Sequence, residues 1–277
     1  MASSERSTHS KPLGESVPIP TNIADHTRLL APEVYEIIRV EGEEELRRPF
    51  QSLLWSGIAA GLAICASIQA KAFLHSALPD TSWRPLLSNL GYTVGFLIVV
   101  LGRLQLFTEN TITAILPLLR RRTSRMLYST ARLWAVVFFA NILGTFTFAA
   151  LSVWAGIASE EHLAAFIEIS EELLHKTPLE SLATGAPAGF LVAAVVWMLP
   201  SADGSKALII IILTYLIGLG HFSHVVVGSG ELWLLLLTGH ASILEVLGHL
   251  FATLVGNILG GTGLFALTAY AQVSEEL

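Results

Sequence analysis

The chain has 277 residues, of which 53% are hydrophobic and 14% charged, and its mean hydropathy is +0.63. Charged residues make up about 25% of soluble domains, so this composition excludes an ordinary soluble protein and indicates an all-α integral membrane protein. The single cysteine, Cys65, excludes a disulfide framework, and we expect no cofactor, no metal site and no nucleic-acid partner.

The N-terminal segment is polar and contains no apolar stretch typical of a cleavable signal peptide. We expect residues 1–35 to form a disordered cytoplasmic tail. Residues 36–49 are charged and helix-prone, which predicts an interfacial helix that ends at Pro49.

Apolar segments fill the rest of the chain, and the last four contain no Lys, Arg, Asp or Glu. They cover residues 50–78, 85–119, 133–158, 181–202, 207–230 and 246–273. A helix needs about 20 residues to cross the hydrocarbon core, so residues 50–273 are predicted to form a transmembrane domain of six spans. Residues 274–277 are its short C-terminus.

The distribution of Lys and Arg sets the orientation, because cytoplasmic loops carry the excess. With the N-terminus inside, the inner segments contain six basic residues besides those of the N-terminal segment: Arg120, Arg121, Arg122, Arg125, Arg132 and Lys206. We therefore expect a multi-pass protein of the cell (inner) membrane with both termini cytoplasmic.

The outer loop 159–180 is acidic. A run of charges is usually a solvated face, and we interpret this one as a solvated amphipathic segment. The alternative is that Lys176, with His175, forms part of an entrance for small anions.

An internal duplication relates the two halves of the domain. The sequence Asn141-Ile142-Leu143-Gly144 recurs 116 residues later as Asn257-Ile258-Leu259-Gly260, and the same offset carries Thr108 onto His224. Because each repeat holds an odd number of spans, the halves lie antiparallel, as a 3+3 inverted repeat. Substrate sites of such folds lie at the repeat interface, so we expect Thr108 and His224 to face each other in a permeation path.

Small residues support the pairing of spans 1 and 4. Gly57 and Gly61 match Gly185 and Gly189, each pair four residues apart. Small residues at this spacing let helix backbones approach closely, and we interpret these four as packing positions.

Spans 2 and 5 are predicted to be broken helices. Span 2 is too long for one straight crossing and has Gly102 and Thr108 near its centre, and span 5 has several glycines around His224. Freed backbone groups at this depth need partners, which Thr108 and Asn110 can supply locally, and Gln105 is expected to support the break as well. Broken half-helices also point positive dipole ends inward, which favours an anionic substrate.

Asn141 and Asn257 are expected to cap or brace these breaks from spans 3 and 6; direct substrate contact is the alternative. Arg103 and Glu109 are costly charges at this depth, about 2.5–3.5 kcal/mol each. We interpret them as an ion pair across the break, near the pore. The alternative is that Arg103 attracts the anion.

Three parts of the sequence together resemble the formate/nitrite transporter family: Leu106-Phe107-Thr108-Glu109-Asn110, His224 and Gly256-Asn257-Ile258-Leu259-Gly260-Gly261. The resemblance covers roughly residues 50–273. It implies an aquaporin-like six-helix fold, a homopentamer with one pore per protomer, and passage of small monovalent anions with a proton. It places Thr108 and His224 at the pore centre. It implies two apolar constrictions, formed by Tyr92 and Phe96 on one side and by Leu106, Phe107 and Val192 on the other.

The sequence departs from the family pattern at several positions. Gln105 replaces an acidic residue, Gly189 and Gly228 stand where asparagines are expected, and Leu173 aligns with the outer-entrance lysine of formate channels. These departures indicate a divergent branch, for which Lys176 is a shifted substitute at best.

The function predicted is a channel or transporter for formate, nitrite or similar weak-acid anions, with proton transfer at His224. The alternatives are a channel for a neutral or cationic solute such as water or ammonia, and a non-conducting relic of the family. An enzyme is not expected, because Ser223 and His224 are neighbours in sequence and neighbouring helical residues do not face each other. Glu231 follows span 5 and is interpreted as a solvated loop acid.

Overall fold

The computed structural model describes residues 29–276, and every regular element in that range is helical. The N-terminal half contains α2 (Ala31–Arg47), α3 (Phe50–Ile64), α4 (Ala66–Ala77), α5 (Arg84–Gly91), α6 (Thr93–Leu101), α7 (Asn110–Thr113), α8 (Ile115–Arg120) and α9 (Ser124–Trp154). The C-terminal half contains α10 (Glu160–Glu171), α11 (Pro178–Met198), α12 (Lys206–Leu219), α13 (Val225–Leu237), α14 (Ile243–Ile258), a π-helical segment (Leu259–Ala266) and α15 (Leu267–Val273).

Five continuous helical stretches of the described chain are long and apolar enough to cross a membrane: Phe50–Ala77, Arg84–Leu101, Ser124–Trp154, Pro178–Ser201 and Ile243–Val273. The fifth predicted span is instead built from two shorter apolar helices, α12 and α13. The chain is therefore a multi-pass membrane protein. Large apolar side chains such as Trp55, Phe139 and Phe251 are exposed on its surface, as expected of faces that meet lipid or other subunits.

The two halves pack in the same way. Helix α3 lies along α9, and α11 lies along α14. A Cβ atom on Gly61 would lie 2.2 Å from Asn141 O, and one on Gly189 would lie 2.2 Å from Asn257 O. The predicted packing role of these glycines is confirmed, because any side chain would force the helices apart.

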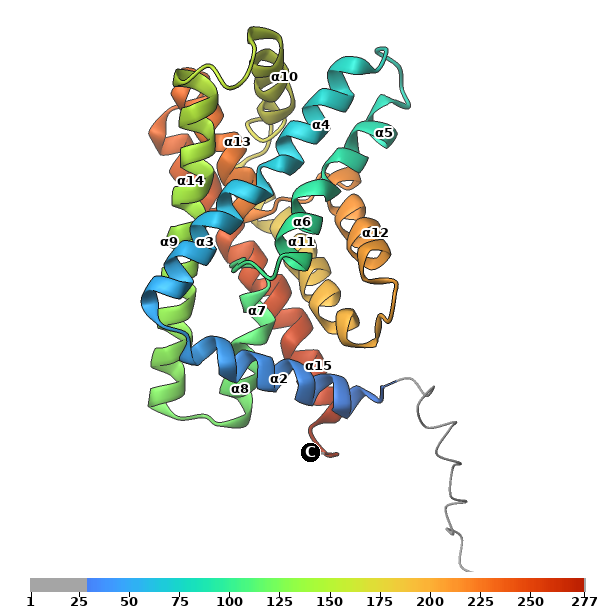
Figure 1. Cartoon of the computed structure of the whole chain (residues 1–277), viewed down its shortest axis with the longest axis vertical. Helices are drawn as coiled ribbons and strands as arrows, with labels where there is room; N and C mark the ends of the chain where they lie inside the picture. The colour runs from blue at the N-terminus through green and yellow to red at the C-terminus, as the bar shows by residue number, and fades with distance from the viewer. Residues whose placement is uncertain (1–28, 277) are drawn as a thin grey trace, which may run out of the picture.

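The two ends of the bundle are covered by different elements (Figure 1). Helix α10 lies at one end and buries Phe166 and Ile169 on its inner side. Helix α2 crosses the other end, where Tyr35 and Ile38 are fully buried. Helix α2 begins at Ala31, so residues 31–35, assigned to the tail from sequence, belong to this helix. The rest of the predicted tail, residues 1–28, lies outside the described residues.

Candidate pore and its polar centre

The helical path is interrupted twice inside the apolar core. Helix α6 ends at Leu101 and α7 begins at Asn110, while α12 ends at Leu219 and α13 begins at Val225. In each gap the residue after a glycine has a left-handed backbone: Arg103 has a φ of 52° and His221 a φ of 50°. The two interruptions therefore share an unusual local geometry.

Each interruption is held by one buried asparagine. Asn141 Nδ2 donates to the carbonyl oxygens of Gly57 and Gln105, both at 2.8 Å, and its Oδ1 accepts from Phe107 N at 2.9 Å. These bonds satisfy backbone groups that the break has released from helical pairing, which an apolar interior requires.

Asn257 repeats this pattern in the second half. Its Nδ2 donates to Gly185 O at 2.9 Å and Ser223 O at 2.8 Å, and its Oδ1 accepts from Val225 N at 2.9 Å. Each amide thus bridges two residues of its interrupted segment and one glycine of the neighbouring helix.

The register of the duplication differs from the sequence-based prediction. Asn141 bridges Gln105 and Phe107, so it holds Leu106 between its bonds. Asn257 bridges Ser223 and Val225, so it holds His224. The equivalent of His224 is therefore Leu106 and not Thr108, because the segments between each break and its asparagine differ in length.

Thr108 and His224 nevertheless meet across the two halves. Thr108 Oγ1 lies 2.8 Å from His224 Nε2, and both residues are buried. His224 is also the N-cap of α13, where its Nδ1 accepts a hydrogen bond from Val227 N at 3.3 Å. With Nδ1 as the acceptor, the neutral ring carries its hydrogen on Nε2, which faces Thr108. The threonine hydroxyl then accepts from the ring and keeps its own hydrogen for another partner.

A cavity of about 330 Å³ is lined by Ile169 of α10 and by His224, and it is called the outer cavity after the predicted orientation of the chain. Lys176 lines it, and its Nζ donates to His221 O at 2.5 Å and Ser223 Oγ at 3.1 Å. Burial lowers the pKa of Lys176, and nearby carboxylates oppose that shift. The structure thus places the predicted entrance lysine at the cavity wall, tied to the second interruption.

An inner cavity of about 520 Å³ lies at the end crossed by α2. Leu106 and Gln105 line it. Gln105 Nε2 donates to Glu45 Oε2 at 2.6 Å, and Gln105 Oε1 accepts from Asn110 Nδ2 at 3.2 Å. Gln105 and Asn110 therefore link the first interruption to α2.

The predicted ion pair between Arg103 and Glu109 is wrong. Arg103 Nη2 instead lies 3.5 Å from Glu41 Oε1, with an exposed side chain. Glu109 Oε1 is buried without a hydrogen-bond partner in the described structure. The left-handed backbone at Arg103 turns its side chain toward α2 and away from Glu109, and both residues line the inner cavity.

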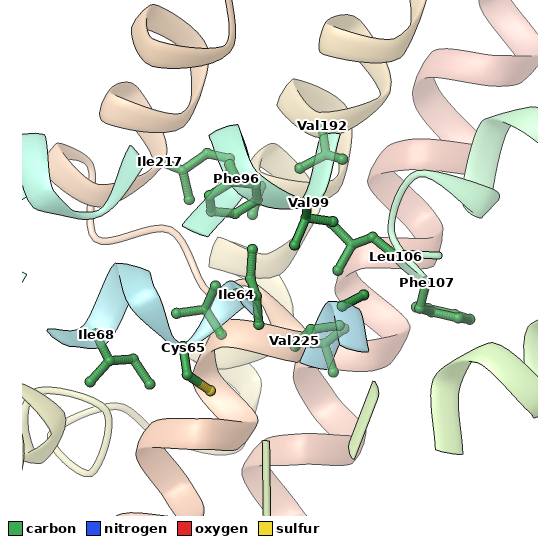
Figure 2. Packing of buried hydrophobic residues seen from close by; sticks show 14 of the residues in the cluster. Ile64, Cys65, Ile68, Phe96, Val99, Leu106, Phe107, Val192, Ile217 and Val225 are labelled. Carbon is green, nitrogen blue, oxygen red and sulfur yellow. The ribbon is translucent and has the colours of Figure 1, made fainter. Parts of the chain in front are cut away.

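The predicted constriction residues lie in three different environments. Tyr92 lines the outer cavity and Leu106 the inner one. Phe96 and Val192 are buried in the apolar cluster that includes Leu106 (Figure 2), and the edge of Phe96 contacts His224 at a centroid distance of 5.0 Å.

Phe107 differs from the other predicted constriction residues in what its side chain contacts. Its ring packs against Trp134 and Phe138 of α9 and lines neither cavity. This packing favours a role in holding the first interruption against α9.

Sequence reasoning missed several charged groups of the outer cavity. Glu231 lies within α13 and is only 7% exposed, so its interpretation as a solvated loop acid is wrong. The break at His224 restarts the helix, and the apolar run Leu232–Leu237 that follows Glu231 was the available signal.

Lys71 and Glu172 form an ion pair at the wall of the outer cavity. Lys71 Nζ lies 3.4 Å from Glu172 Oε2, and His221 Nδ1 lies 3.3 Å from the same oxygen. Burial alone would raise the pKa of Glu172, but the hydrogen bond with His221 and the charge of Lys71 outweigh it and lower that pKa to about 2. The segment after α10 is therefore fastened to α4 by an ion pair and to the second interruption by a hydrogen bond.

Comparison with known proteins decides the family. The family model for formate/nitrite transporters matches residues 32–271. The chain belongs to the formate/nitrite transporter family. It is 42% identical to the inner membrane protein YfdC of Escherichia coli K12 over 249 residues, which cover 88% of this chain and 79% of that protein.

Solved members of the family share the fold. An ion channel of the formate/nitrite transporter family superposes with a TM-score of 0.77 at 18% identity, covering 87% of this chain and 99% of that one. A pentameric formate channel with formate bound superposes with a TM-score of 0.69 at 21% identity, covering 82% and 98%. The predicted aquaporin-like helical fold is confirmed.

Proposed function

We propose that this protein is a membrane channel or transporter for small monovalent anions of weak acids, such as formate or nitrite, which cross together with a proton. The observation that carries the proposal is the buried contact between Thr108 and His224 at the inner limit of the outer cavity. Family membership and the formate bound in a solved relative support the substrate class.

Thr108 supplies the hydrogen bond to the anion in this proposal. His224 Nε2–H donates to Thr108 Oγ1, and the threonine hydroxyl hydrogen remains available for a substrate oxygen. A hydrogen bond to a charged group is worth about 1.5–3 kcal/mol, which partly offsets the desolvation of an anion in an apolar passage. The two residues therefore act as one unit from opposite halves of the protein.

The source of the proton is a separate question. A histidine that relays a proton passes through the doubly protonated ring, in which Nδ1 also carries hydrogen. Nδ1 of His224 accepts the amide hydrogen of Val227, so protonation there would break the cap of α13. Proton transfer through His224 requires this cap to open, whereas orientation of Thr108 by the neutral ring requires no rearrangement.

One observation favours a second candidate, a channel for a neutral solute such as ammonia or water. Lys71 at the outer cavity is paired with Glu172, which offsets its charge, and Lys176 Nζ is already hydrogen-bonded to His221 O and Ser223 Oγ, so both cations are engaged by the protein. Anion flux through the purified protein separates the two candidates.

The proposal extends to the assembly and orientation of the protein. We propose a homo-oligomer, a pentamer by analogy with the solved formate channel, with residues 50–273 as the channel domain of each protomer. The basic residues at the α2 end, such as Arg121, which is paired with Glu43 of α2, and Lys206, which shares a cavity with Glu41, support a cytoplasmic location for that end and both termini.

The test is flux into liposomes that hold the purified protein and an internal pH dye. Inward gradients of formate, nitrite, acetate and lactate are expected to acidify the interior faster than in empty liposomes. His224→Phe is expected to abolish the signal, while His240→Phe, which changes an exposed histidine, is expected to retain it. Unchanged flux in an assembled His224→Phe oligomer would contradict the role of His224. If the wild-type protein gives no signal for any anion, the neutral-solute candidate is tested by osmotic swelling.

A further inference from the structure

Glu231 occupies the pore-facing side of α13. It lies seven residues after His224, which places the two on nearly the same side of the helix, roughly 10 Å apart along its axis. Gly228, between them, also lines the outer cavity, and a Cβ atom there would meet only Leu173, at 3.8 Å. The wall from Glu231 down to His224 is therefore open to a small molecule.

The carboxyl group of Glu231 lacks a protein partner. The residue is 7% exposed, and no hydrogen bond or ion pair joins it to another residue of the described chain. Glu172 at the same wall contrasts with it, because it contacts both Lys71 and His221. A buried carboxylate without such partners is strongly disfavoured, whereas a protonated carboxyl group is tolerated.

Several charged and titratable groups surround this part of the cavity. Those that line it are Lys71 from α4, Tyr92 between α5 and α6, Glu172, His175 and Lys176 from the segment between α10 and α11, His221 before α13, and His249 from α14. The thiol of Cys65 also faces α13, 3.1 Å from where a Cβ atom on Gly230 would lie. Lys71 is already paired with Glu172, and Lys176 is bonded to His221 O and Ser223 Oγ. Neither lysine is in ion-pair contact with Glu231, so its carboxyl group is left to exchange a proton with the cavity.

We infer that Glu231 is the proton donor of the outer cavity, which converts the entering anion into its neutral acid before it reaches Thr108 and His224. This inference rests on the proposed function. The O–H bond of the Glu231 carboxyl breaks and the proton joins an oxygen of the anion, which leaves a carboxylate on Glu231 and the weak acid in the cavity. A hydronium ion from the outer solution then restores the proton.

In this proposal the residues of the outer cavity have different roles. Lys71 and Lys176 hold positive charge in the cavity, and Lys176 does so beside Ser223, next to His224. Glu231, roughly 10 Å from His224 along the axis of α13, neutralises the anion, and neutral acid crosses the apolar cluster of Phe96 and Leu106 without carrying a charge into it. His224 keeps its cap on α13 throughout, because the proton comes from another residue.

The test compares Glu231→Gln with Glu168→Gln, a matched change on the exposed side of α10. Uptake of isotopically labelled formate and internal acidification are measured at about pH 5.5 and about pH 7.5. Glu231→Gln is expected to slow both at the higher pH by at least about tenfold and by less at the lower pH, where hydronium ions are abundant. Glu168→Gln is expected to match the wild type at both values.

A direct measurement accompanies the flux assay. Infrared carbonyl bands of protonated carboxyl groups are measured at neutral pH, and one band of the wild-type protein is expected to be lost in Glu231→Gln. Glu109, whose Oε1 is also buried without a partner in the described structure, is expected to contribute a band of its own to both proteins. Glu231→Asp keeps the carboxyl group, so it is expected to recover part of the flux that Glu231→Gln loses.

The outcomes that overturn the inference are distinct. Unchanged flux in Glu231→Gln, or a wild-type minus Glu231→Gln infrared difference spectrum in which no protonated-carboxyl band is lost, excludes Glu231 as the donor. Faster flux in Glu231→Gln shows an ionised carboxylate that repels anions, which also overturns it. Failure of the proposed function appears earlier, as the absence of formate uptake by the wild-type protein itself, and the inference then falls with it.

Discussion

The two helix interruptions, residues 102–109 and 220–224, are built alike and carry different chemistry. Asn141 and Asn257 make the same three hydrogen bonds, and Gly61 and Gly189 lie against them in the same way. The residue held between the bonds is Leu106 in one half and His224 in the other. Symmetry is therefore kept where the backbone needs support, and it is lost where a side chain meets the passage.

The largest expected effect is the loss of either brace. Asn141→Leu and Asn257→Leu each leave buried backbone groups without partners, and each such group costs about 1–3 kcal/mol. Both variants are expected to lose most of the assembled protein, to a similar extent, as measured by size-exclusion chromatography and thermal unfolding in detergent.

Asn89→Leu provides the matched control for these substitutions. Asn89 is a buried asparagine whose Nδ2 donates to Pro85 O and whose Oδ1 has no partner in the described structure. Asn89→Leu is expected to destabilise the protein clearly less than either brace variant. A brace variant as stable as Asn89→Leu would show that the interruptions do not depend on their asparagines.

The next largest effect concerns Thr108, the residue of the first half that contacts His224. Thr108→Val keeps the shape of the side chain and removes the hydroxyl that faces His224. Loss of about 1.5–3 kcal/mol of hydrogen bonding to an anion corresponds to a fall in formate flux of roughly 10- to 100-fold. Thr108→Ser is expected to retain most of the flux in the same liposome assay, and equal loss in both variants would argue for packing instead.

A smaller effect concerns the outer wall alone. The pKa of Glu172 is lowered from 4.5 to about 2 by His221 and Lys71, against the effect of burial. A carboxylate with a lowered pKa contributes stability above its unfolded value, and that stability is lost as the pH falls toward the folded value. Thermal unfolding between about pH 4.5 and pH 2 is therefore expected to depend less on pH in Glu172→Gln.

Glu160→Gln, at the start of α10, is the control for this pH dependence, and its unfolding temperature is expected to vary with pH as in the wild type. If the unfolding temperature of Glu172→Gln falls with pH as steeply as that of the control over this pH range, Glu172 is not the group that causes the loss of stability in acid.

The smallest effect tests the matched left-handed residues. Arg103→Gly removes an exposed ion pair with Glu41, worth about 0–1 kcal/mol, and relieves about 1–2 kcal/mol of backbone strain. Its unfolding temperature is expected to stay near that of the wild type. His221→Gly relieves the same strain but also loses the contact with Glu172, so it is expected to be the less stable variant. If Arg103→Gly instead folds poorly, the charge of Arg103 has a structural role.

Much of the scaffold was predictable from sequence because it depends on local signals. Long apolar stretches predict the spans, glycines predict the interruptions and close helix contacts, and the repeated Asn-Ile-Leu-Gly predicts the braces. The meeting of Thr108 with His224 followed from the duplication, although by a register that the hydrogen bonds of Asn141 with Gln105 O and Phe107 N correct.

The remaining errors concern the direction of side chains after a break. Arg103 turns toward α2 because its backbone is left-handed, which spacing along a helix does not reveal. Glu231 is buried because α13 starts afresh at His224, so a residue counted as the end of a span lies in the middle of a half-helix.

The most direct test of the central claim is a double-mutant cycle on formate flux with Thr108→Val, His224→Asn and the double variant, because Asn keeps an N-cap acceptor for α13 and removes the ring nitrogen that contacts Thr108. If the two residues form one hydrogen-bonded pore centre, the double variant is expected to conduct no worse than the more impaired single variant. Losses that multiply would show independent roles, and full flux in either single variant would contradict a pore centre at this contact.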